Sequence, residues 1–233
     1  MIKFENTEVV GWESAIRGMR NPMNSWEKID SRAKPYSNEE FDNVEAGHGF
    51  YHIGADDLTL MKKLKAAGTD HRKFMRMLTV YVDITAPLYW WKEFDTYKVG
   101  TVANSCSTMH KIAEKEFIMD DFSCEHMSND LLDLMQTIVN TLNIRRRDFL
   151  KSNEKTFWWD MIQLLPSSYN QRRTVMLNYE VLANIYKSRK NHKLDEWSVS
   201  RADSSGNLKS GFGFCDWIRT LPYSELITME NTK

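Results

Sequence analysis

Alternating apolar and polar positions predict one clear strand in this chain. From residue 78 to residue 85, every second side chain is apolar, which is the period of a sheet with one buried face. The positions expected on the buried face are Leu78, Val80, Val82 and Ile84. A shorter strand is predicted at residues 7–10, ahead of a helix at residues 13–20 that Asn21-Pro22 ends.

Apolar residues spaced three and four positions apart predict that helices dominate the rest of the chain. They are expected between residues 58 and 67, from 88 to 94, after Ser128, at 158–165, at 175–187 and at 216–221. Asp56 and Asp57 would cap the first of these helices and Gly68 would end it. Pro87 would occupy the first turn of the second, and Pro166 would end the fourth.

Two polar segments are predicted as loops. Residues 22–54 contain Pro35, Gly47 and Gly49, a composition typical of a long surface loop, and residues 204–213 are rich in Gly and Ser. Because helices dominate and no repeat of about 20 to 50 residues is present, we expect a single α+β domain over residues 1–233. In this fold class, helices pack on a small mixed or antiparallel sheet.

Composition narrows the classes of function. The 233 residues are 42% hydrophobic, which is enough for a substantial core, and the net charge of -1 gives no overall attraction to nucleic acid or to an anionic membrane. No apolar run approaches the roughly 20 residues that span a bilayer, and the first residues do not resemble a signal peptide. The three cysteines lack the spacing of a disulfide or zinc framework, so a cytoplasmic protein is expected.

Charge is distributed unevenly along the chain. Between residues 145 and 193 there are eleven basic and four acidic residues, a balance of +7. Such a segment suits a phosphate-bearing ligand, because Arg donates two parallel hydrogen bonds to phosphate oxygens. A solvated helix face is the alternative interpretation.

Aromatic and histidine clusters are further candidates for ligand or metal binding. Aromatic residues gather at positions 89–91 and 158–159, where they either stack on a base or flavin ring or pack in a core or interface. His48 and His52 have the spacing of two metal ligands on one helical face, but the glycines beside His48 argue against a helix, so no metal site is predicted. The common dinucleotide, triphosphate and serine-hydrolase motifs are absent from the sequence.

A segment of about 25 residues, 165–189, resembles a known family. It has a Leu-Pro dipeptide at 165–166, hydroxyl-bearing residues at 167–169, Asn178 twelve positions after the proline, and Arg189 where the following helix is expected to end. The match has no gap. This pattern resembles the late part of the flavin-dependent thymidylate synthases, which carry Leu-Pro, Ser/Thr-Tyr-Thr, Asn-x-Arg and a helix-ending Arg.

Two earlier segments extend the resemblance to about two thirds of the chain. His71 and Phe74 precede the predicted strand, as the His-x-x-Phe of the family precedes its own strand. Residues 15–17, Ala-Ile-Arg, lie where the family has an Ala-Ala-Arg helix.

The catalytic signature of the family, RHRxxSxNExSxR, is largely absent after the strand. Lys98 and Thr101 are chemically similar to one Arg and to the first Ser, and a shift of one position matches Asn104 and Ser107 to the Asn and the last Ser. Glu180 stands where the family has the Arg of Asn-x-Arg, and a carboxylate that faces a phosphate dianion is repulsive.

The resemblance implies a homotetramer in which FAD and a deoxyuridine phosphate bind between subunits. It assigns cofactor binding to His71, Lys98, Thr101 and Asn178. It assigns substrate binding to Glu93, Asn104, Ser107, Arg172, Arg173, Glu180 and Arg189. No catalytic residue is assigned, because in this chemistry the flavin carries the hydride and the protein supplies placement and electrostatics.

The expected function is therefore a thymidylate-synthase-like protein that binds a (deoxy)uridine-type nucleotide and FAD. Two alternatives stay open. One is an active synthase that makes dTMP from dUMP with a reduced nicotinamide cofactor and methylenetetrahydrofolate, in which Lys98, Thr101 and Arg189 replace the missing arginines. The other is a non-enzymatic, oligomeric protein that binds or sequesters nucleotides.

Overall fold

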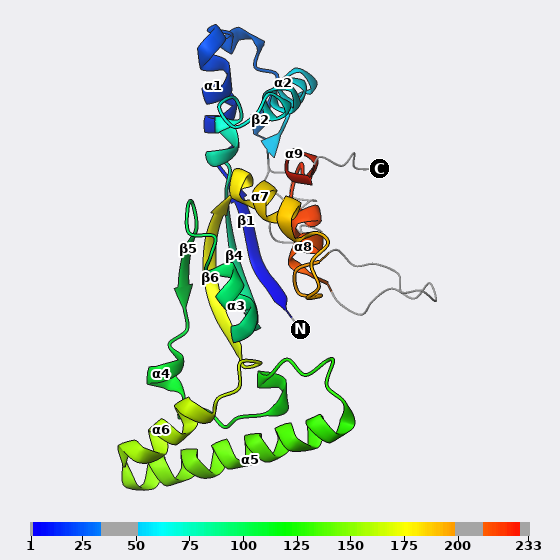
Figure 1. The fold of residues 1–233 in the computed structure, drawn as a ribbon. Coiled ribbons are helices and arrows are strands. Elements are labelled where there is room, and N and C mark those ends of the chain that lie inside the picture. Colours follow the sequence, from blue (N-terminus) through cyan, green and yellow to red (C-terminus); the bar gives the residue numbers. More distant parts are fainter. Residues whose placement is uncertain (1, 34–50, 199–211, 229–233) are drawn as a thin grey trace, which may run out of the picture. The chain divides into compact units, whose positions relative to one another are not determined.

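The computed structural model describes residues 2–33, 51–198 and 212–228 (Figure 1). The main sheet has the strand order β1-β4-β6-β5, and β2 pairs with β3 in an antiparallel ribbon. The strands are β1 (Lys3–Val10), β2 (Arg32–Ala33), β3 (Tyr51–His52), β4 (Thr79–Pro87), β5 (Val102–Ser105) and β6 (Asn170–Asn178). The helices are α1 (Trp12–Arg20), α2 (Ala55–Ala66), α3 (Leu88–Phe94), α4 (Thr108–Lys111), α5 (Asn129–Ser152), α6 (Lys155–Leu164), α7 (Tyr179–Arg189), α8 (Phe214–Thr220) and α9 (Glu225–Thr228), with 3-10 turns η1 (Asn21–Met23), η2 (Trp26–Lys28), η3 (Lys73–Arg76) and η4 (Met119–Asp121). Within the described ranges, no helix is both long and apolar enough to cross a membrane.

The predicted α+β class is confirmed, and β4 forms where alternation placed it. Leu78, just before the strand, and Val80, Val82 and Ile84 within it are all buried. Tyr81 on the opposite face is exposed. One face of this strand therefore lies against the core and the other does not.

The predicted helix at residues 175–187 is wrong in its first turn. Residues 175–178 belong to β6, where Val175 and Leu177 are buried and the residues between them are only partly buried. Helix α7 begins at Tyr179, capped by Asn178, whose Oδ1 accepts the backbone N–H of Val181 at 3.0 Å. The apolar residues of strand and helix run into one another without a break, so periodicity alone merges them.

The predicted caps of α2 and α3 are also wrong. The N-cap residue of α2 is Gly54, and Asp56 and Asp57 lie inside its first turn. Asp30, distant in sequence, performs the capping: its carboxylate accepts the backbone N–H groups of Asp56 at 2.9 Å and Asp57 at 3.0 Å. Burial raises the pKa of Asp30, but these donors outweigh it and the pKa is lowered. For α3, Pro87 is the N-cap residue, not a residue of the first turn.

The segment predicted as a long loop is only partly described. Residues 22–33 contain parts of the 3-10 turns η1 and η2 and the strand β2, while residues 34–50, including His48, lie outside the described residues. Of the predicted Gly/Ser loop, residues 204–211 lie outside them as well.

The chain divides into two compact units. The first comprises Ile84–Thr96 and Asn104–Arg173, with the start of β1. The second comprises Phe4–Asp83, Tyr97–Ala103 and the described residues from Thr174 onward.

The core of the first unit lies around the consecutive helices α5 and α6. Helix α6 lies alongside α5 (Figure 1), and a cluster of buried apolar side chains fills the space around them. The members are Ile112, Phe117, Phe122, Met135, Val139, Leu142 and Met161. Asn143 ties the preceding segment to α5, because its amide accepts from the N–H of Phe117 at 2.9 Å and donates to its carbonyl at 2.8 Å.

The second unit is built around α7, α8 and α9, which lie close together (Figure 1). Tyr179 is fully buried, packs edge-on against Trp12 with ring centroids 5.5 Å apart, and donates to the carbonyl of Pro222 at 2.6 Å. Phe4 stacks on Trp217 at 5.1 Å. Aromatic packing therefore fixes the first turn of α7. The predicted site residues Asn178 and Glu180 belong to the cap and first turn of this helix, and Thr101 lies close to them.

Candidate functional site

A cavity of about 770 Å³ opens in the first unit, where the end of β5 faces the start of β6. Ser107 and Arg172, both expected to bind substrate, lie on its wall although 65 positions separate them in sequence. Tyr169, Lys111 and Lys115 line it as well. The structure thus brings two of the predicted substrate residues to one hollow.

Hydrogen bonds hold the walls of this cavity together. The backbone N–H of Cys106 donates to the carbonyl of Arg172 at 3.0 Å, and the amide of Gln171 donates to the carbonyl of Cys106 and to Oγ1 of Thr108, both at 3.0 Å. Ser107 caps the short helix α4, with its Oγ accepting the N–H of His110 at 3.3 Å. The strand β6 therefore positions the segment 106–108 directly.

Charged groups of both signs surround the cavity. Lys111 pairs with Glu114 at 2.8 Å and Lys115 with Asp121 at 2.5 Å. The hydrogen bond from Lys115 to Asp121 raises the pKa of Lys115, and burial raises the pKa of the Tyr169 phenol. Four basic and four acidic residues line the cavity, so their formal charges balance, and Arg172 and the Tyr169 phenol are the groups on which an anionic ligand would depend.

Arg173 lies on the other side of β6 from Arg172, as neighbouring strand residues do. Its guanidinium stacks 4.1 Å above the Trp91 ring and donates to Asp95 at 2.8 Å and to Gln171 at 3.0 Å. Arg173 is thus bound within the protein, and it does not line the cavity. The geometry does not join it to Arg172 as a phosphate-binding pair.

The remaining predicted substrate residues of the first unit are apart from the cavity wall. Asn104 is an exposed residue of the edge strand β5, and Glu93 is a half-buried residue of α3. Neither lines the cavity.

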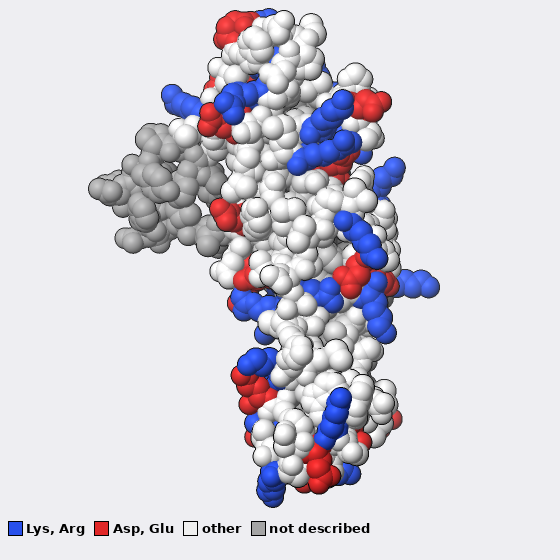
Figure 2. Space-filling view, turned by 90° about the vertical axis from the view of Figure 1, so that its left-hand side faces the viewer, with Lys and Arg blue, Asp and Glu red and all other residues white. Residues whose placement is uncertain are grey.

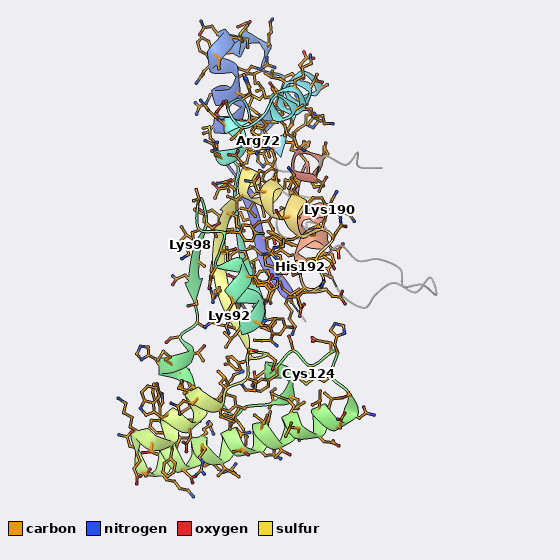
Figure 3. The ribbon with its side chains drawn as sticks, viewed as in Figure 1. Arg72, Lys92, Lys98, Cys124, Lys190 and His192 are labelled. Atoms are coloured by element: carbon orange, nitrogen blue, oxygen red, sulfur yellow. The ribbon has the colours of Figure 1, made fainter. Side chains whose placement is uncertain are left out.

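A second group of predicted residues meets at the start of α7, in the second unit. Gly100 has a φ of 74°, and a Cβ there would lie 2.8 Å from Nδ2 of Asn178, so only glycine lets the loop come this close. Next to it, the buried Oγ1 of Thr101 has no hydrogen-bond partner in the part of the chain that is described. Lys98 lies on the same loop (Figure 3) and is exposed.

Arg189, at the other end of α7, holds that loop. Its Nε donates to the Tyr97 hydroxyl at 2.9 Å, its Nη1 lies 2.8 Å from Nε2 of His192, and its guanidinium lies 5.0 Å from the centre of the Trp197 ring. Arg189 was expected to bind substrate. In the structure it is a link between α7 and the segment that carries Lys98 and Thr101.

Glu180 is paired with two arginines that sequence reasoning missed. Its Oε1 accepts from Nε of Arg72 at 3.0 Å, and its Oε2 accepts from Nε of Arg76. Burial raises the pKa of Glu180, but the hydrogen bonds from Arg76 and Arg72 more than reverse this and lower it. The carboxylate thus stays ionised inside a cluster whose net charge is +1. The one available signal was the pair of arginines on either side of Phe74 in the His-x-x-Phe segment.

His71 lines a different cavity of the second unit, of about 1010 Å³. Apolar side chains form much of its wall, among them Met19, Phe74 and Met77. His71 is therefore not among the residues that line the cavity of Ser107 and Arg172.

The basic segment between residues 145 and 193 is spread over several elements. On α5, Arg145 contacts Asp148 and Asp160 at 3.3 Å each, and Arg146 donates to the carbonyl of Ala113 at 3.0 Å. On the face drawn in Figure 2, basic and acidic side chains are interspersed. Arg145 and Arg146 are thus bound within the protein, and of the eleven basic residues of the segment Arg172 is the member that lines the cavity described above.

The aromatic clusters mostly pack inside the protein. Trp90 and Trp91 are buried and meet edge-on, and Trp90 stacks on Phe94. Trp159 is exposed on α6. In the described ranges, no group of three or more His, Cys, Asp or Glu side chains is placed to hold a metal ion.

Comparison with solved structures identifies the fold. Thymidylate Synthase X (ThyX) from Helicobacter pylori, solved with FAD and dUMP, matches with a TM-score of 0.61 and 13% identity, over 99% of this chain and 98% of that chain. The chain has the fold of a flavin-dependent thymidylate synthase. A second structure of flavin-dependent thymidylate synthase ThyX from Helicobacter pylori, complexed with FAD and dUMP, gives a TM-score of 0.57 and 14% identity, over 97% and 98% of the two chains. No protein-family model matches the sequence, and no curated protein matches it significantly.

Proposed function

We propose that this protein binds a (deoxy)uridine-type nucleotide and FAD as a thymidylate-synthase-like protein. One observation carries the proposal: Ser107 and Arg172, chosen for their resemblance to the family, lie on one cavity in a chain that shares the thymidylate synthase fold over nearly its full length. The synthase of that fold is known with FAD and dUMP bound.

The cavity of the first unit suits a nucleotide. At about 770 Å³, it lies within the range of small-molecule sites. Arg172 would bind the phosphate, since its planar fork matches two phosphate oxygens. Ser107 and Tyr169 would donate or accept hydrogen bonds at the sugar or base.

The start of α7 suits part of FAD. Within the described ranges, the buried Thr101 hydroxyl has no hydrogen-bond partner and Nδ2 of Asn178 makes no hydrogen bond, so two polar groups next to Gly100 keep hydrogen-bonding capacity for a ligand. Thr101, Asn178 and Lys98 would hold the cofactor there, and His71 would contact another part of it from the larger cavity. Bound FAD supplies hydride transfer, and these residues bind and orient it.

The proposal includes a homotetramer in the cytoplasm. Apolar side chains stand exposed on the outside of α5, among them Leu134, Ile144 and Leu150, and such residues are commonly covered in an assembly. Light scattering of the purified protein should give four times the mass of one chain, 27.4 kDa.

Calorimetric titration of the full-length protein with dUMP tests the nucleotide site. We expect binding, and we expect Arg172→Gln to weaken it about tenfold, equivalent to about 1.4 kcal/mol for a charge-assisted bond. Lys151→Gln is the matched control, because it removes one positive charge from α5, away from the cavity. Equal affinity of the two variants, or no binding by the natural protein, would reject the assignment.

Rescue of a thymidine-requiring strain separates the proposal from the active synthase. Growth would show that methyl transfer from methylenetetrahydrofolate persists without most of the family signature. No growth, together with dUMP binding in the titration, would identify a binding protein that has lost the reaction.

A further inference from the structure

Two arginines converge on one carboxylate at the start of α7. Arg72 directly precedes η3, Arg76 ends it, and Glu180 lies in the first turn of α7. Oε1 of Glu180 accepts from Nε of Arg72, and Oε2 accepts from Nε of Arg76. In addition, Nη2 of Arg76 lies 3.5 Å from Oε1. Figure 3 shows Arg72 next to the first turn of α7.

This geometry uses only one edge of each guanidinium. Arginine has five N–H donors in a fixed plane, so contacts through Nε leave donors on the far edge directed away from the carboxylate. Beyond Glu180, neither guanidinium group has a hydrogen-bond partner within the described part of the chain. The cluster therefore keeps unused donors in fixed directions.

Exposure increases outward through the cluster. The side chain of Glu180 is 9% exposed, that of Arg72 21% and that of Arg76 50%. The carboxylate of Glu180 thus lies at the buried end of the cluster, and the unused arginine donors lie toward solvent. One arginine would neutralise Glu180, so the second leaves a net positive charge that the internal contacts do not use.

We infer that Arg72 and Arg76, oriented by Glu180, form a binding site for a phosphoryl anion. Arg donors arranged in a plane recognise phosphate oxygens in pairs. Glu180 is a positioning residue here, because it holds both arginines in place without contacting the anion. Asp70 also lies close enough to favour the charged form of Arg76, and it opposes anion binding.

The anion can be the diphosphate of FAD or the monophosphate of a nucleotide. This choice rests on the proposed function, because Glu180 is two residues from Asn178 in the candidate cofactor site. The anion site itself does not depend on it. Inorganic pyrophosphate is therefore the first probe, followed by FAD against riboflavin and dUMP against deoxyuridine.

Glu180→Gln gives opposite results under the two explanations of the cluster. If Glu180 only repels anions, its neutralisation strengthens pyrophosphate binding. If it orients the arginines, the variant binds about fivefold more weakly despite its more positive charge. Arg76→Gln should weaken binding about tenfold. Lys187→Gln is the matched control, because Lys187 is an exposed residue near the end of α7 and lines neither of the two cavities described above.

The double variant Arg76→Glu with Glu180→Arg guards against misfolding. It keeps an ion pair and the same net charge, so it should melt within a few degrees of the natural protein. It should lose pyrophosphate affinity at least as strongly as Arg76→Gln, because a carboxylate then takes the more exposed place of Arg76. Unchanged or tighter binding by Glu180→Gln, or equal effects of Arg76→Gln and Lys187→Gln, would overturn the inference. If pyrophosphate binds as expected but FAD and dUMP do not, the site stands and the proposed function fails.

Discussion

Replacing Asp57 should destabilise the protein more than any surface change. Asp57 is fully buried in the first turn of α2, and its Oδ1 accepts from both Nε and Nη2 of Arg20 at 2.7 Å. Its Oδ2 accepts the backbone N–H groups of Asp30 at 3.2 Å and Ser31 at 3.1 Å, and the Ser31 hydroxyl at 2.6 Å. One carboxylate thus accepts hydrogen bonds from an arginine, two backbone N–H groups and a hydroxyl.

The two sides of this ion pair should differ in their cost. Asp57→Ala leaves the buried Arg20 charge and two backbone donors unpaired, so we expect a loss of about 3–5 kcal/mol of unfolding free energy. Arg20→Met leaves a carboxylate that still has three donors, and we expect about 1.5–3 kcal/mol. The total free energy of unfolding of a native protein is about 5–15 kcal/mol, so Asp57→Ala could lose most of the stability of the folded state.

Urea unfolding of both single variants and of the double variant measures these values. The double variant should be less destabilised than the sum of the singles, because it leaves no unpaired buried charge. A cost below about 1 kcal/mol for Asp57→Ala, or a larger cost for Arg20→Met than for Asp57→Ala, would refute the reasoning.

Two further predictions concern pH and the loop of the candidate cofactor site. Burial lowers the pKa of Lys65 from 10.5 to about 8, so between these pH values the unfolded chain binds more protons than the folded one. The free energy of unfolding should therefore increase from pH 8 to pH 10, by roughly 1–2 kcal/mol after allowance for solvent screening. Urea unfolding of Lys65→Met should lack this increase, and an equal increase in the variant would contradict the assignment. Arg189→Lys removes the guanidinium that contacts both Tyr97 and His192, so the loop that carries Thr101 should become less well held. FAD affinity, measured by flavin fluorescence, should therefore fall about tenfold. Unchanged affinity would show that Arg189 does not position the loop.

Local periodicity predicted the parts of the fold whose burial follows one period. β4 is buried at every second residue, and α5 starts after Ser128, as expected. β6 was missed because its apolar residues continue into those of α7. The cap of α2 was missed for a different reason: Asp30 reaches the helix start from 26 positions away, and no local pattern records such a contact.

The family resemblance found part of the candidate site, and the rest depends on the fold. It selected Ser107 and Arg172, which share a cavity, and Thr101 and Asn178, which lie on either side of Gly100. It could not separate Arg172 from its neighbour Arg173. That distinction is made by Trp91 and Asp95, which hold Arg173 on the opposite side of the strand.

Glu180 shows why a residue's charge is insufficient to infer its role. In sequence, a carboxylate at the position of an expected arginine argues against phosphate binding there. In the structure, Arg72 and Arg76, 108 and 104 positions earlier, supply two positive charges to that place, so the sign of the cluster is the reverse of the sign of the residue. Loss of the Arg from Asn-x-Arg is therefore compatible with anion binding at the start of α7, because the electrostatic potential depends on all charges in contact and not on one position.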